Sequence, residues 1–222
     1  MTILEQKLAE LKERLMTMAA IAEEMVSHSI QALVKRDEAL ARRVIDVDEP
    51  RVNNLELEIE DLAIQIIALH QPEATDLRSL AMIIKVNNDL ERIGDHAENI
   101  AEATLFLISR PLVKPLIDLP VMSEQSIGML RDSLDAFTRS DPKLARDVCR
   151  RDSIVDDLKN AINRELAVCM TKDAATVERA LKLMMISLNL ERIADHATNI
   201  SEDVIYMTTG EVIKHGRGRV SG

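Results

Sequence analysis

Two stretches of the sequence carry carboxylates at a spacing that suits metal binding. Glu91 and Asp95 stand four residues apart, and Glu191 and Asp195 repeat the pair one hundred residues later. A four-residue step on a helix brings two side chains to the same face, where like charges repel each other and cost helix stability. Carboxylates that converge without nearby cations suit a hard metal ion, which takes several oxygen ligands. The pairs therefore predict metal coordination.

A second set of oxygen-bearing residues stands at the same four-residue spacing upstream of each acidic pair. If each of these helices runs beside the acidic helix that follows it, two pairs face each other across a groove. The alternative is that these acids form an ordinary solvent-exposed helix face without a metal. Because the paired residues recur in both halves of the sequence, the metal-site interpretation is favoured. The candidate metal ligands are Glu49, Asn53, Glu91, Asp95, Asp152, Asp156, Glu191 and Asp195.

The basic residues near these acids are expected to have other roles. His96 and His196 each follow the first acid of their pair by five residues, so they lie roughly 140° away around the helix. We therefore expect both histidines to be polar residues at the helix edge and not metal ligands. Arg92 and Arg192 are expected to pair with neighbouring acids.

The acidic pairs belong to an internal repeat, which is the most specific feature of the sequence. Residues 90–102 read LERIGDHAENIAE and residues 190–202 read LERIADHATNISE, so ten of thirteen positions are identical. A match of this length at a fixed offset indicates a duplicated structural unit. The two halves are therefore expected to share one fold.

Apolar residues recur at alternating steps of three and four, the pattern of long helices that pack against partners. Thr2 with Glu5 reads as a capping box, and Pro72 ends the second helix. The pattern predicts an all-α protein of six long helices, arranged as two tandem, duplicated antiparallel three-helix bundles placed end to end. The predicted parts are a first bundle (1–110), a proline-rich linker (111–120), a second bundle (121–209) and a flexible basic tail (210–222).

Composition supports this fold and limits the classes of function. Aromatic residues make up only 1% of the chain, whereas methionine occurs 11 times, which favours helices over strands. The net charge of −10 argues against nucleic-acid binding, which needs a basic surface. The sequence shows neither an apolar run of about 20 residues nor the apolar core of a signal peptide, so a cytoplasmic location is expected.

Two copies of L-E-R-I-x-D-H-A, each preceded by a pair similar to E/D-x-x-x-D on the neighbouring helix, resemble the PhoU family of bacterial phosphate-signalling regulators. The resemblance covers residues 3–209. It implies one multinuclear metal site per bundle and a cytoplasmic, often homodimeric protein. Oxygen-only ligands suit Mg, Mn or Ca, and the resemblance also allows Fe or Zn. It also implies repression of the phosphate-starvation response, through contact with a sensor histidine kinase and the ATPase subunit of a phosphate ABC transporter.

One candidate site departs from the family pattern. Asn53 stands where the family usually has aspartate, and Pro50 directly follows Glu49. Proline removes a helical hydrogen bond and biases the preceding residue away from the helical conformation. We therefore expect a weaker or differently shaped metal site in the first half.

Two other classes of function compete with the regulator. One is a carboxylate-rich helical protein for metal binding or storage, and the other is a metal-free structural spacer. An enzyme is not expected, because the sequence offers no Ser-His-Asp or Cys-His constellation and no phosphate-cradling loop.

Overall fold

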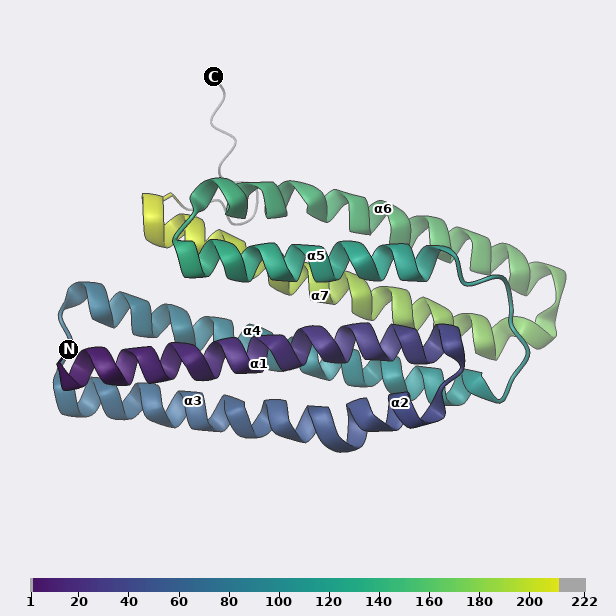
Figure 1. Cartoon of the computed structure of the whole chain (residues 1–222). Coiled ribbons are helices and arrows are strands. Elements are labelled where there is room, and N and C mark those ends of the chain that lie inside the picture. The colour runs from purple at the N-terminus through teal and green to yellow at the C-terminus, as the bar shows by residue number, and fades with distance from the viewer. Residues whose placement is uncertain (1, 212–222) are drawn as a thin grey trace, which may run out of the picture.

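The computed structural model describes residues 2–211, and these residues form helices joined by short connections. In chain order they are α1 (Ile3–Lys35), α2 (Glu38–Arg43), a π-helical turn (Val44–Asp48), α3 (Glu49–His70), α4 (Ala74–Ile108), α5 (Asp118–Arg139), α6 (Pro142–Lys172), a 3-10 turn (Ala174–Thr176) and α7 (Val177–Thr209) (Figure 1). The predicted all-α fold with six long helices is confirmed, because α2, the π-helical turn and α3 follow one another without a break.

The π-helical turn explains how the second long helix continues past a proline. A proline ring in a helix clashes with the carbonyl four residues earlier, and for Pro50 that residue is Asp46, inside the turn. The wider hydrogen-bonded ring of a π-helical turn accommodates this clash locally. Glu49 keeps helical dihedral angles (φ −59°, ψ −52°), so the expectation that Pro50 moves Glu49 out of the helical conformation is wrong.

The helix termini follow the capping residues that the sequence offers. The backbone N–H of Glu5 donates to Thr2 Oγ1 at 3.2 Å, and the backbone N–H of Thr2 donates to Glu5 Oε2 at 2.8 Å, which completes the predicted capping box. Asp141 caps α6 by accepting hydrogen bonds from the backbone N–H groups of Lys143 and Leu144, and Pro142 occupies the first helical position. Helices α1 and α6 therefore each begin at a residue whose side chain accepts hydrogen bonds from the first backbone N–H groups.

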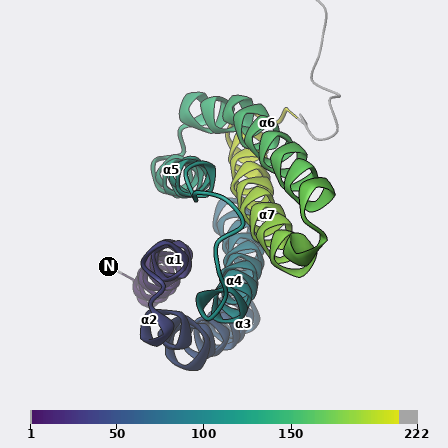
Figure 2. The same ribbon diagram turned by 90° about the vertical axis from the view of Figure 1, so that its right-hand side faces the viewer.

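The two bundles lie side by side along their length. Helices α1, α3 and α4 form the first bundle, and α5, α6 and α7 form the second. Helix α4 packs along α7, and α1 packs against α5, as Figure 2 shows from the end of the molecule. The end-to-end arrangement expected from the sequence is therefore wrong. The reason is that α4 and α7 are buried on more than one face, so each contacts its own bundle and the other bundle.

Polar contacts between α4 and α7 repeat with the offset of the duplication. His96 Nδ1 donates to Asn189 Oδ1 at 2.9 Å, and His196 Nδ1 donates to Asp89 Oδ1 at 2.8 Å. The two imidazole rings lie 5.5 Å apart between their centroids. These equivalent contacts show that the repeats meet antiparallel across a local two-fold axis. Both histidines thus lie at the junction of the bundles.

None of the helices in residues 2–211 carries an apolar stretch long enough to cross a membrane.

Helix α5 begins at Asp118, two residues before the expected end of the linker. The domain bounds 1–110 and 121–209 stay a prediction. Of the predicted basic tail (210–222), all but its first two residues lie outside the described part of the chain.

The two histidine contacts are expected to differ in strength. Asp89→Ala should cost about 1.5–3 kcal/mol of unfolding free energy, because an ionised acceptor strengthens a hydrogen bond and His196 loses its partner. Asn189→Ala removes the neutral equivalent and should cost about 0.5–1.5 kcal/mol. Urea unfolding at pH 7.5 measures both losses of free energy. Equal losses would contradict the expectation that the contact between His196 and Asp89 is the stronger of the two.

Candidate metal centre

Helices α3 and α4 bring three carboxylates together in the first bundle. Glu49 lies at the start of α3, and Asp95 and Glu98 lie on the facing side of α4. One carboxylate oxygen of each residue lies within 4.8 Å of the others, and all three side chains are half-buried. Oxygen atoms grouped at this separation fit a hard cation placed between them. This is the candidate metal centre.

Close approach of the two helices places these acids within reach of each other. A Cβ atom on Gly94 would lie 3.1 Å from Cγ1 of Val52, so the absent side chain lets α4 approach α3 beside Asp95. Asn53 Nδ2 donates a hydrogen bond to Glu49 Oε1 and orients that carboxylate. Asn53 therefore acts on the site through Glu49.

The charges in this group are poorly compensated by the protein. Partial burial raises the pKa of Glu98, and the neighbouring charges of Glu49, Glu102 and Asp95 raise it further. Burial likewise raises the pKa of Glu91, to which Asp95 adds, while Arg92 acts in the opposite direction. A raised carboxyl pKa means that the ionised form is disfavoured in the folded protein. A bound cation would relieve that cost.

The structure changes the membership of the predicted site. Asp95 and Glu49 lie in the three-carboxylate group, whereas Glu91 lies outside it. Glu98 belongs to the group and is absent from the predicted ligands. Its position three residues after Asp95, on the same acidic stripe, was a usable signal. The prediction relied on pairs present in both halves, and the second half has Thr198 at the equivalent position.

Three acids of the second bundle form ion pairs with basic residues of the same bundle. Lys159 Nζ donates to Glu191 Oε1 at 2.8 Å and to Asp156 Oδ1 at 3.1 Å. Arg192 contacts Asp195 Oδ2 at 3.1 Å, as expected for that arginine. Within residues 2–211, the three-carboxylate group of the first bundle has no counterpart in the second. An ammonium group thus lies between the acids of α6 and α7.

Lys159 has a counterpart of opposite charge in the first bundle. It follows Asp152 by seven residues, just as Glu56 follows Glu49. The pKa of Asp152 is still raised, by burial first and then by the charges of Asp195, Asp156 and Glu191. The geometry therefore groups three carboxylates in the first bundle, and the expectation of a weaker or differently shaped site there stays a prediction. Metal binding by the predicted ligands of either bundle stays a prediction.

Fold and site together define a class of protein: a duplicated helical bundle whose paired helices carry half-buried carboxylates. The family model described as "PhoU domain" matches residues 15–104 and 119–204, one copy in each bundle. The chain belongs to the PhoU family.

Relatives match over nearly the whole chain. The phosphate-specific transport system accessory protein PhoU homolog of Aquifex aeolicus is 41% identical over 95% of both chains. The homolog of Caulobacter vibrioides is 40% identical and covers 97% of this chain and 94% of its own. The crystal structure of PhoU from Pseudomonas aeruginosa superposes with a TM-score of 0.89 at 33% identity, over 93% of this chain and 99% of that one.

Removing one carboxylate charge is expected to stabilise the metal-free protein. Glu98→Gln relieves repulsion from Glu102 and Glu49 and should add about 0.2–0.5 kcal/mol at pH 7.5 in EDTA. Because folding raises the pKa of Glu98, the native state takes up a proton first as the pH falls. As the pH falls from 7.5 to 4, the unfolding free energy of the wild type should therefore rise toward that of Glu98→Gln. Urea unfolding measures this, with Glu124→Gln as the control; a destabilised Glu98→Gln protein would contradict the repulsion.

Removing the ammonium group is expected to open a metal site in the second bundle. Lys159→Met leaves Asp156 and Glu191 without their cation, so the variant should gain Mn²⁺ binding and lose stability in EDTA. Equilibrium dialysis with Mn²⁺ measures the stoichiometry, and Lys143→Met, at an exposed position, is the matched control. Unchanged Mn²⁺ stoichiometry and affinity in Lys159→Met would show that the lysine does not occupy a metal position.

Proposed function

We propose that the protein is a cytoplasmic regulator of phosphate homeostasis, which represses the phosphate-starvation response when phosphate is plentiful. The observation that carries this proposal is the match of a PhoU domain to each bundle, together with relatives named phosphate-specific transport system accessory proteins. Those relatives align over nearly the whole chain, so the proposal applies to the two bundles together.

The proposed mechanism is contact with a sensor histidine kinase and with the ATPase subunit of a phosphate ABC transporter. A homodimer would present two copies of each surface. Long helices with exposed apolar side chains suit docking to other proteins. On α3, Leu57, Ile64 and Leu69 are 62%, 54% and 75% exposed, respectively. The net charge of −10 favours basic protein surfaces over nucleic acid as partners.

In this proposal Glu49, Asp95 and Glu98 hold a metal ion (Mg, Mn, Fe or Zn). The ion would supply the positive charge that the crowded carboxylates lack. Because the ligands come from α3 and α4, the ion would brace these two helices against each other. Its proposed role is structural, and the contact surfaces act on partners only when the bundle is held in one shape.

We propose that the protein is not an enzyme. Burial raises the pKa of the Cys149 thiol to about 11, so this thiol stays protonated at neutral pH and is a poor nucleophile. The storage alternative is less well supported, because the carboxylates of storage bundles point into the core. Here the three acids are only half-buried and lie between two helices near the surface.

The function is tested with a phosphate-starvation reporter in phosphate-rich medium, in a strain from which the gene is deleted. The wild-type chain should silence the reporter, and Glu49→Gln/Asp95→Asn/Glu98→Gln should release it, because the braced surface is lost. The control Glu13→Gln/Glu124→Gln/Asp157→Asn removes the same charge from exposed positions and should silence as the wild type does. Immunoblots and circular dichroism verify equal expression and folding.

Each contrary outcome has a distinct meaning. A folded wild-type chain that fails to silence the reporter rejects the regulatory function. Silencing by both the wild type and the triple acid variant keeps the regulator and rejects the metal centre as a requirement. Release by the triple variant and the control alike would assign the effect to net charge.

A further inference from the structure

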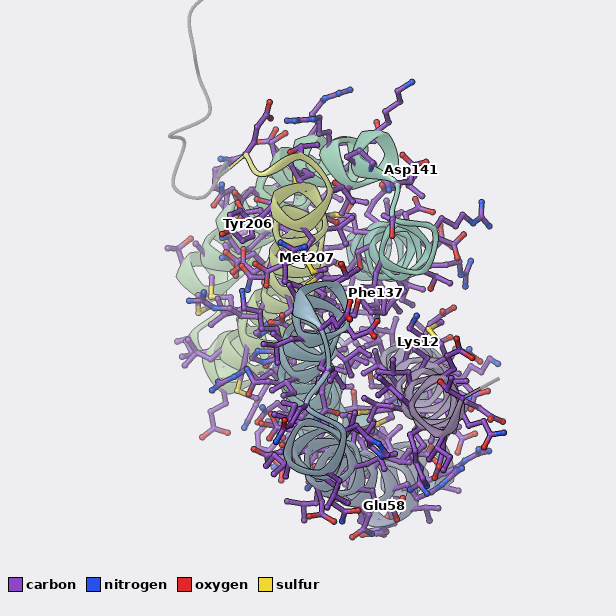
Figure 3. All side chains as sticks on the ribbon, turned by 90° about the vertical axis from the view of Figure 1, so that its left-hand side faces the viewer. Lys12, Glu58, Phe137, Asp141, Tyr206 and Met207 are labelled. Atoms are coloured by element: carbon purple, nitrogen blue, oxygen red, sulfur yellow. The ribbon has the colours of Figure 1, made fainter. Side chains whose placement is uncertain are left out.

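A cavity of about 330 Å³ lies at the end of the molecule where the two bundles meet. Helices α1 and α4 of the first bundle and α5 and α7 of the second all contribute to its walls. Figure 3 views this end: Phe137 and Met207 lie near each other between the bundles, and Lys12 lies on α1 below them. The buried side chains of Met82, Ile83 and Val204 form an apolar floor.

The mouth of the cavity is polar and carries positive charge only. Lys12 and Arg78 are exposed at the mouth, and neither forms an ion pair with another residue in the described part of the chain. No carboxylate lines this cavity among the described residues. Hydroxyl groups complete the lining: Thr75, Ser79, Thr138, Ser140 and Thr208. In a chain of net charge −10, two unpaired cations beside one cavity are a local departure from the overall charge.

We propose that this cavity binds a small amphipathic anion, with an apolar chain or ring on the floor and a phosphate or carboxylate group at the mouth. A largely apolar cavity with a few convergent polar groups is the usual form of a small-molecule site, and its volume lies at the lower end of the usual range. Guanidinium and ammonium groups form strong, charge-assisted hydrogen bonds with phosphate and carboxylate oxygens. A basic ligand would meet two like charges.

The partial charges at the ends of the surrounding helices do not reverse the preference of the cavity for an anion. Helix α4 begins here, and its positive N-terminal end favours an anion; its N-cap residue Glu73 makes no side-chain capping hydrogen bond. Helices α5 and α7 end at Arg139 and Thr209, and their C-terminal carbonyl groups act in the opposite direction. Helix termini carry about half a charge each, so the two full side-chain charges dominate.

The ligand would act on the arrangement of the two bundles. It would contact α1 and α4 on one side and α5 and α7 on the other, and binding to this arrangement stabilises it by a free energy that rises with the logarithm of ligand concentration above the Kd. The site is independent of the proposed metal centre and of the proposed regulation of phosphate uptake. Its chemistry rests on Lys12, Arg78 and the apolar floor alone.

The test uses the full chain in EDTA, with hexyl phosphate and hexanoate as probes of the two anionic groups. Calorimetry and thermal unfolding should show saturable binding of at least one probe, with a Kd below about 1 mM, and a raised Tm. Hexanol and inorganic phosphate should each bind at least about tenfold more weakly, because each lacks one half of the ligand. The probe that binds more tightly identifies the anionic group.

Lys12→Gln/Arg78→Gln should weaken binding of the preferred probe at least about tenfold, since it removes both charged donors. Lys143→Gln/Arg164→Gln removes two exposed cations elsewhere and should bind as the wild type does. Thr138→Glu is a second variant, at an exposed position; it places a negative charge at the mouth and should also weaken binding at least about tenfold. The proposal is overturned if neither probe binds saturably to the wild type, or if both charge variants bind the probe as tightly as the wild type.

Discussion

The packing of α4 against α7 is the contact on which the rest of the structure depends. Each helix carries one copy of the repeated motif, and each copy serves two contacts at once. One side of the motif presents acids toward the preceding helix of its own bundle, and another presents a histidine toward the other copy. Because a single helix fulfils both roles, the position of each carboxylate group is fixed relative to the junction of the bundles. Duplication thus produced both the fold and its central interface.

The two bundles solve the same electrostatic problem in different ways. Half-buried carboxylates on adjacent helices are costly unless a cation lies between them. In the second bundle Lys159 supplies that cation permanently, whereas the equivalent residue of the first bundle is Glu56, which adds to the negative charge. Glu98, whose equivalent in the second copy of the repeat is Thr198, adds another carboxylate to the first bundle. Under the proposed function, metal supply therefore acts on the first bundle by mass action.

Local signals in the sequence were sufficient to predict the long helices, the capping box at Thr2 and the duplication. Apolar periodicity reports that a helix face is buried, but it does not state which helix covers that face. For this reason the sequence predicted three-helix bundles correctly and placed them end to end incorrectly. The π-helical turn before Pro50 was missed because proline rules describe a regular helix. Glu98 was missed because the prediction relied on pairs present in both halves, and Lys159 was missed because only the folded structure shows which charges meet across neighbouring helices.

Helix α4 links the candidate metal centre and the cavity, yet the two sites act on different interfaces. Arg78 and Asp95 lie 17 residues apart on this helix, which corresponds to about 25 Å along its axis. A metal ion held by Glu49, Asp95 and Glu98 would brace α3 against α4 inside one bundle, whereas a ligand in the cavity would hold the first bundle against the second. Sites so far apart that share no partner contribute nearly additively to stability. Strong coupling between metal and ligand would therefore require α4 itself to change shape, and its continuous helix from Ala74 to Ile108 offers no break at which to do so.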